Sequence, residues 1–132
     1  MMIRFLSDHD IELYVRLLWT HFSADEWRGL GVADCHMFAD LHIDLASSDR
    51  DVWLRCQHEQ LLLITGNRNM EGEDSLEAVI RDLNQVDSLP VITIARPKMM
   101  VEFKYREDCA YRIADIVADL SNLRGTGRQV VP

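Results

Sequence analysis

Three short and almost entirely apolar runs, at 3–6, 61–65 and 91–95, limit most strongly how this chain can fold. Strands that are apolar along their whole length are typical of parallel sheets that helices cover on both faces. Apolar residues at helical spacing separate and follow these runs, at 11–22, 48–58, 76–86 and 109–120. This alternation predicts an α/β fold, namely a three-layer α/β/α sandwich with a short parallel central sheet.

The length and composition of the chain predict how it is organised. With 132 residues, 48% of them hydrophobic, it can form one domain with a core of ordinary size. We expect a single domain over residues 1–121. We expect a flexible C-terminal tail over 122–132, because this segment has two glycines and little apolar periodicity. Within 23–46 a capping pattern at 23–26 predicts a short helix, whereas 36–43 fits neither a strand nor a helix well.

Composition also bears on the compartment and on the partners of the chain. No apolar run approaches the roughly 20 residues that a membrane-spanning helix needs, so no membrane association is expected. The three widely spaced cysteines favour free thiols in a reducing cytoplasm over disulfides. The formal net charge of −8 argues against binding of nucleic acid through overall positive charge. Segment 96–106 is an exception, with four basic residues and one acid.

The carboxyl ends of parallel strands form the edge at which α/β proteins place their sites. Polar and charged residues follow each apolar run or begin a helix near this edge: Asp8, Asp10, Asp49, Asn67, Arg68, Asn69, Arg96 and Lys98. Clustered carboxylates at such an edge are suited to Mg²⁺ or Mn²⁺, and arginine or lysine is suited to phosphate. The competing interpretation, which spacing alone favours, is that the acids merely cap helices or occupy their first turns.

Three segments together resemble the small bacterial PIN-like domain proteins. They read FLSDHD at residues 5–10, SDRDV at 48–52 and LLITGNRN at 62–69, and their order and intervals match that family over about residues 3–100. The resemblance implies a PIN-like fold and a ribonuclease centre that depends on Mg²⁺ or Mn²⁺. It makes Asp8 the first metal-binding acid, Asp49 the second, and Asp10 a neighbour of the first.

The sequence departs from this family at Asn67 and Asn69, where the family usually has aspartate. An asparagine can offer a carbonyl oxygen to a cation, but it carries no charge and cannot act as a base. Two hypotheses therefore follow. In the first, the chain is a ribonuclease with Asp8, Asp49 and Asn67 as catalytic residues. In the second, the same fold has lost catalysis and acts by binding protein or RNA.

The ribonuclease hypothesis assigns the remaining polar residues and the partners. Metal ligands are expected to be Asp8, Asp10, Asp49, Asn67 and Asn69, and substrate-binding residues are expected to be Arg68, Arg96 and Lys98. The resemblance implies an RNA substrate and a small antitoxin-like protein as partners, and a homodimer is a further interpretation. A receiver-like signalling domain is a weaker alternative, because it would need a phosphoacceptor aspartate where this chain has Thr65-Gly66-Asn67.

Overall fold

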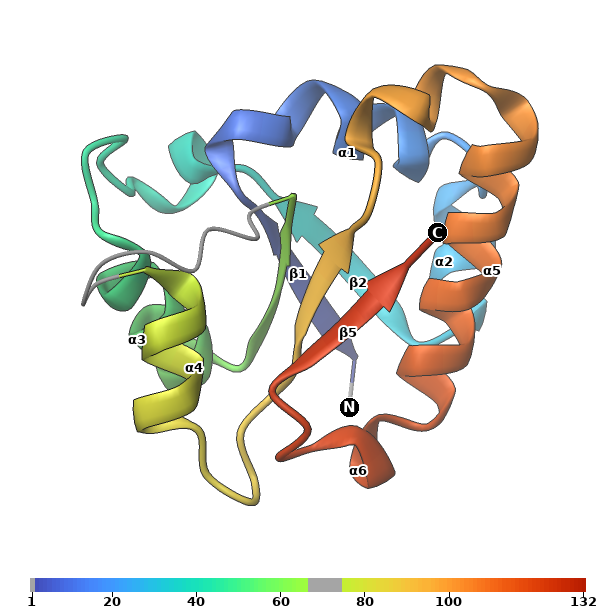
Figure 1. The fold of residues 1–132 in the computed structure, drawn as a ribbon. Helices are drawn as coiled ribbons and strands as arrows, with labels where there is room; N and C mark the ends of the chain where they lie inside the picture. Colours follow the sequence, from blue (N-terminus) through green and yellow to red (C-terminus); the bar gives the residue numbers. More distant parts are fainter. Residues whose placement is uncertain (1, 67–74) are drawn as a thin grey trace.

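The protein is an α/β/α sandwich built on a parallel five-stranded sheet, described by a computed structural model over residues 2–66 and 75–132 (Figure 1). The strand order is β2-β1-β3-β4-β5, and every neighbouring pair is parallel. The strands are β1 (Ile3–Ser7), β2 (Val32–His36), β3 (Leu61–Thr65), β4 (Val91–Ile94) and β5 (Arg128–Val131). The predicted fold class is confirmed.

Helices connect the strands and cover both faces of the sheet. The α-helices are α1 (Glu12–Trp19), α2 (Ala24–Gly29), α3 (Asp49–Glu59), α4 (Leu76–Leu83), α5 (Phe103–Ala118) and α6 (Leu120–Leu123). Short 3-10 helices are η1 (His9–Ile11), η2 (Phe38–Leu41) and η3 (Pro97–Val101). In Figure 1, α3 and α4 lie on one side of the sheet, and α5 lies on the other side.

Alternation along the buried strands divides the core into two layers. In β3, Leu62 and Ile64 pack into the layer beneath α1 and α5, whereas Leu61 and Leu63 pack into the layer beneath α3 and α4. All of β3 is buried, which explains why its sequence is a continuous apolar run. The three-layer architecture therefore follows from the strand residues themselves.

The C-terminal segment does not form the flexible tail expected over 122–132. Helix α6 (Leu120–Leu123) overlaps its start, and Arg128–Val131 form β5, which pairs with β4 along its whole length. Val131 is fully buried. That prediction is wrong because parallel pairing with β4 stabilises a strand whose own residues, RQVV, carry little strand signal.

The segment 23–46 contains a strand that the sequence did not reveal. Residues Val32–His36 form β2 at the edge of the sheet, and the ambiguous stretch 36–43 becomes η2 instead of a longer strand or helix. Asp34 in β2 is exposed, as an edge strand allows, so the segment lacks a continuous apolar run. The predicted helix at 23–26 is confirmed, because Ser23 and Glu26 form a complete capping box.

The strand order reverses direction between β1 and β3. From β1 the chain passes to β2 on one side of the sheet, and β3, β4 and β5 then follow on the other side. In open α/β sheets, such a switch point leaves a crevice beyond the carboxyl ends of the two strands, and ligands bind there. The residues that immediately follow β1 and β3 are therefore the candidates for a ligand-binding site.

Candidate metal centre

A small cavity of about 50 Å³ lies beyond the carboxyl end of β1. Three of the acids predicted from the sequence, Asp8, Asp10 and Asp49, line this cavity. Its other lining residues are His9, Phe38, Ser47, Val52, Leu63 and Leu76. Its position at the switch point and its lining agree with the prediction that these acids share one edge of the sheet.

Asp8 is fixed at the junction of β1 and β3. Its backbone N–H donates to the Ile64 carbonyl at 2.8 Å, and the Thr65 hydroxyl donates to Asp8 Oδ2 at 2.8 Å. Asp8 stands at the start of η1, but its side chain makes no capping hydrogen bond there. The interpretation of Asp8 as a simple helix cap is therefore wrong, because its carboxylate is directed to Thr65 instead.

The surroundings of Asp8 disfavour its ionised form. Burial raises the pKa of the Asp8 carboxyl above its ordinary value, and the charges of Asp10 and Asp49 raise it further. The Thr65 hydrogen bond and His9 act in the opposite direction without cancelling the rise. A carboxylate in this situation gains free energy from a nearby cation, which offsets both the burial and the repulsion between like charges.

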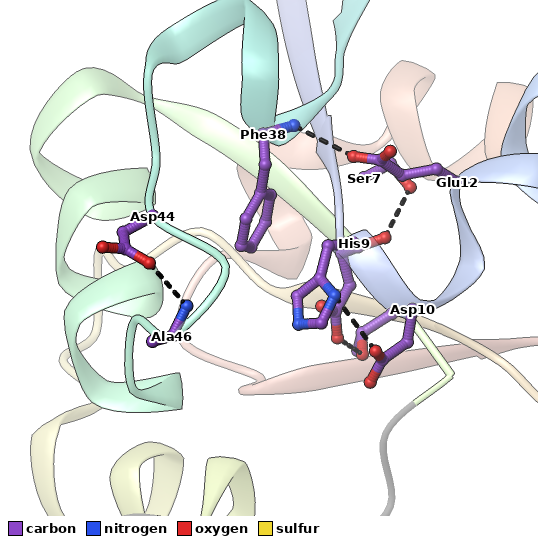
Figure 2. A network of polar contacts seen from close by, with 9 residues as sticks. Ser7, His9, Asp10, Glu12, Phe38, Asp44 and Ala46 are labelled. Atoms are coloured by element: carbon purple, nitrogen blue, oxygen red, sulfur yellow. Dashed lines mark hydrogen bonds and ion pairs between the residues drawn. The ribbon is translucent and has the colours of Figure 1, made fainter.

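His9 and Asp10 complete one end of the cavity. His9 Nδ1 lies 3.1 Å from Asp10 Oδ1, and the imidazole packs edge-on against Phe38 with 5.2 Å between ring centroids. Figure 2 shows the His9 ring between Phe38 and Asp10. Potential ligand atoms of Asp8, His9 and Asp10 all lie within 4.8 Å of one another, the one such group found among the described residues. His9 is not among the site residues predicted from the sequence, although its position between two acids indicated a possible role in proton transfer.

Asp49 reaches the cavity from the first turn of α3. The hydroxyl of Ser48 accepts a hydrogen bond from the Asp51 N–H at 3.1 Å and so caps this helix. Asp49 therefore stands at the positive end of the helix dipole, where a carboxylate is stabilised. Its charge acts on Asp8, and both residues line the same cavity.

Two polar contacts to backbone N–H groups hold the segments beside the cavity. The Phe38 N–H donates to Glu12 Oε2 at 3.1 Å, which ties η2 to α1 beside the cavity. In the loop that leads to α3, the Ala46 N–H donates to Asp44 Oδ1 at 2.8 Å. Figure 2 shows both contacts, on either side of the Phe38 ring.

The structure does not bring Arg96 and Lys98, two of the three predicted substrate-binding residues, to the cavity. Arg96 and Lys98 follow β4 and are exposed, but neither lines the cavity. The Arg96 backbone N–H donates to the Tyr105 hydroxyl, which in turn donates to the Pro132 carbonyl, so this segment is tied to the end of β5. The other three predicted residues, Asn67, Arg68 and Asn69, lie outside the described residues.

A second cavity of about 160 Å³ adjoins the first and was not anticipated from the sequence. The two cavities share Ser47 and Val52, so they form neighbouring parts of one surface beside α3. Its remaining lining residues are His42, Ile43, Asp44, Asp51 and Arg55. No sequence pattern indicated this second cavity, because the loop 42–47 has no periodicity and its position beside α3 depends on the tertiary fold.

The cysteines are poor candidates for chemistry. Burial raises the pKa of the Cys56 and Cys109 thiols to about 12 and raises that of Cys35 further still. Because the thiolate is the reactive form, all three thiols are chemically quiet at neutral pH.

No protein-family model, no curated protein and no solved structure matches this chain. Across residues 2–66 and 75–132, no helix has the length and apolar character that spanning a membrane requires.

Proposed function

We propose that this protein is a divalent-metal-dependent ribonuclease of PIN-like type. The observation that carries the proposal is the convergence of Asp8, Asp10 and Asp49 on one cavity at the switch point of the sheet. The sequence resemblance assigns metal-binding roles to the same acids.

The residues present fit Mg²⁺ or Mn²⁺. These cations prefer carboxylate oxygens, and Asp8, Asp10 and Asp49 supply three carboxylates. The raised pKa of Asp8 indicates a carboxylate that a cation would stabilise. Asn67 and Asn69 remain proposed oxygen ligands from the segment outside the described residues, and Asn67 also remains a proposed catalytic residue.

Each described residue has a distinct task in this proposal. Asp8 would hold the cation, with its Oδ2 oriented by the Thr65 hydroxyl, and Asp49, which is outside the 4.8 Å group of Asp8, His9 and Asp10, would complete the site from the start of α3 across the same cavity. His9 restrains the Asp10 carboxylate through its 3.1 Å contact. A bound Mg²⁺ or Mn²⁺ supplies charge neutralisation for an RNA phosphate and an activated water for hydrolysis.

Neutralisation by the cation also bears on the repulsion between RNA and a chain with a net charge of −8. Without a cation, three carboxylates at the cavity repel a phosphate backbone. With a cation bound, that repulsion would be reduced, and Arg96 and Lys98, which follow β4, would assist from outside the cavity, whereas Arg68 remains a proposed substrate-binding residue outside the described residues. RNA binding is therefore expected to depend on the metal.

Loss of catalysis with retention of binding is the second candidate function. It is favoured by Asn67 and Asn69, which stand where the PIN-like family usually has aspartates. A cavity with fewer charged ligands binds Mg²⁺ more weakly, so the protein would act through RNA or protein contacts alone. The receiver-like alternative is disfavoured because Thr65, and not an aspartate, ends β3.

The test is cleavage of single-stranded RNA with Mn²⁺ or Mg²⁺, measured for the wild type and for Asp8→Asn. Asp25→Asn is the matched control, since Asp25 is 97% exposed and lies outside both cavities. We expect cleavage by the wild type and the control, suppression by EDTA, and a loss of at least about tenfold in Asp8→Asn.

Two results would contradict the proposal. Equal cleavage by the wild type and Asp8→Asn would show that the activity does not come from this site. Cleavage by neither, combined with RNA binding, would support the binding module instead.

A further inference from the structure

Gly66 follows Thr65, the last residue of β3, at the edge of the sheet that carries the candidate metal centre. A methyl group at position 66 would lie 2.8 Å from Cγ of Pro97 and 3.4 Å from Cγ2 of Ile11. Carbon atoms in favourable contact are about 3.5–4.0 Å apart, so the first of these distances leaves no room for a side chain. The absence of a side chain at Gly66 therefore allows η1 and η3 to pack against the end of β3.

Position 66 requires space and does not require an unusual backbone conformation. Gly31, Gly125 and Gly127 have positive φ angles, at which other residues are strained, whereas Gly66 does not. By contrast with Gly66, a methyl group at Gly29 would meet nothing within 4 Å. An alanine at position 66 would therefore keep the backbone conformation but would collide with its neighbours.

The Pro97 ring cannot easily move away from Gly66. Pro97 is the first residue of η3, and its ring is rigid. The Arg96 N–H donates to the Tyr105 hydroxyl at 2.9 Å, and Met100 is fully buried. The 3-10 helix η3 also packs against α1 and α5, and Figure 1 shows the chain after β4 beside α1. A side chain at position 66 is therefore expected to displace β3 or η1 more than η3.

Gly66 is linked to Asp8 along two routes. Thr65 immediately precedes Gly66, and its hydroxyl donates to Asp8 Oδ2 at 2.8 Å. Ile11, which would contact a side chain at position 66, donates its N–H to the Asp8 carbonyl at 3.3 Å. The Asp8 N–H in turn donates to the Ile64 carbonyl at 2.8 Å. Movement of either β3 or η1 would therefore change the position of the Asp8 carboxylate.

We propose that Gly66 is a positioning residue for Asp8 in the candidate metal centre. By leaving space for Ile11 and Pro97 at the end of β3, Gly66 keeps the Thr65 hydroxyl on Asp8 Oδ2 and keeps η1 in its place beside the cavity. The consequence for metal binding rests on the proposed function. The consequence for the position of Asp8 rests on the contacts alone.

The test combines a substitution that fills the space at position 66 with one that restores it. Gly66→Ala adds the methyl group, and Pro97→Ala removes Cγ and Cδ, the two Pro97 atoms that this methyl group would approach. The double variant therefore lacks the collision with η3. Gly29→Ala is the matched control, because it makes the same substitution where there is open space.

Affinity for Mn²⁺, measured by calorimetry on the whole chain, tests the consequence for the metal centre. Gly66→Ala is expected to bind Mn²⁺ about tenfold more weakly than the wild type, as substitution of a residue that orients a metal ligand typically does. Gly29→Ala, Pro97→Ala and the double variant are each expected to bind Mn²⁺ within about threefold of the wild type. Restoration by Pro97→Ala identifies the contact between positions 66 and 97 as the cause.

Amide hydrogen exchange without metal tests the position of Asp8 directly. Its N–H bonds to β3 beside the cavity, whereas the Val91 N–H donates to the Gly127 carbonyl at 2.9 Å at the opposite end of the sheet. Gly66→Ala is expected to reduce the protection of the Asp8 N–H by about tenfold or more relative to that of Val91. Addition of Pro97→Ala is expected to restore this protection.

Three results would overturn the proposal. The first is unchanged protection of the Asp8 N–H in Gly66→Ala. The second is an equal loss of protection at Asp8 and Val91, which would show only that the whole protein is less stable. The third is failure of Pro97→Ala to restore the protection, or the folding, of Gly66→Ala.

The two measurements separate this proposal from the proposed function. A wild type that binds no Mn²⁺ would refute the metal centre, and the exchange of the Asp8 N–H without metal would still decide whether Gly66 positions Asp8. Conversely, Mn²⁺ binding that Asp8→Asn weakens and Gly66→Ala does not would support the metal centre and refute the role of Gly66.

Discussion

Asp8 occupies a position that disfavours its charge. Its carboxyl is largely removed from water, shares a cavity with Asp10 and Asp49, and accepts one hydrogen bond from Thr65. A residue needed only to begin η1 could do so without this arrangement, and the Asp8 side chain makes no capping bond. Structures retain such destabilising residues mainly where they serve a function.

The sign of the Asp8 pKa shift gives a testable pH dependence of stability. Because the folded-state pKa is raised, the contribution of Asp8 to stability is fully present below the unfolded pKa of about 3.8. It is lost as the pH rises through the folded-state pKa. Without added metal, Asp8→Asn is therefore expected to become more stable relative to the wild type as the pH rises from about 4 to about 7.

The expected gain is about 1.4 kcal/mol for each unit by which folding raises the Asp8 pKa. Urea unfolding of both proteins across this pH range measures it. The difference in free energy of unfolding between Asp8→Asn and the wild type could instead stay constant with pH, or change in favour of the wild type as the pH rises. Either result would show that the Asp8 charge is not disfavoured in the folded protein.

At the level of elements, local signals predicted some parts of the structure well and missed others. The helical pattern that begins at residue 48 predicted the start of α3, which Ser48 caps in the structure, and placed Asp49 near the edge of the sheet. By contrast, β2 contains exposed Asp34 and only one fully buried residue, Val32, so no apolar run predicted this strand. The helix expected over 76–86 ends at Leu83, because Asn84 leaves the helical conformation and Val86 is exposed.

The capping serines offer a matched pair of variants at this scale. Ser48 caps α3 beside the cavity, and Ser23 caps α2 away from it, each through one hydrogen bond to a backbone N–H. Ser48→Ala and Ser23→Ala are each expected to lower the free energy of unfolding by about 1 kcal/mol. Only Ser48→Ala is expected to reduce the stabilisation by Mn²⁺, because only α3 carries Asp49.

Thermal unfolding with and without Mn²⁺ measures both effects. An equal reduction of the Mn²⁺ stabilisation by the two substitutions, or none by Ser48→Ala, would count against a role of the α3 start in holding the cation.

For the whole molecule, the sequence predicted the fold class and the edge of the sheet that carries the acids, but it did not predict the two edge strands. The apolar runs of β1, β3 and β4 predicted three buried strands. By contrast, β2 and β5 are edge strands, and their pairing depends on residues that are distant in the sequence. The convergence of Asp8 and Asp49 was predictable, because parallel strands end at a common edge. The adjoining cavity with His42 and Arg55 was not, since it depends on where the loop 42–47 lies.

The role of β5 in the molecule can be tested with two adjacent valines. Val131 is fully buried, and Val130 is 47% exposed on the same strand. Val131→Ala is expected to lower the free energy of unfolding by about 2 kcal/mol, and Val130→Ala by less than about 0.5 kcal/mol. Denaturant unfolding measures both, and equally small effects would indicate that the C-terminal segment does not contribute to the folded sheet.

Binding of Mn²⁺ to the whole chain, measured by calorimetry or by the loss of the free-ion signal in electron paramagnetic resonance, tests the proposed metal centre without relying on RNA cleavage. We expect saturable Mn²⁺ binding by the wild type and by the exposed control Asp25→Asn. The affinity of Asp8→Asn for Mn²⁺ is expected to be lower by about tenfold or more. Equal Mn²⁺ affinity of the wild type and Asp8→Asn, or no binding by either, would contradict a metal centre at Asp8, Asp10 and Asp49.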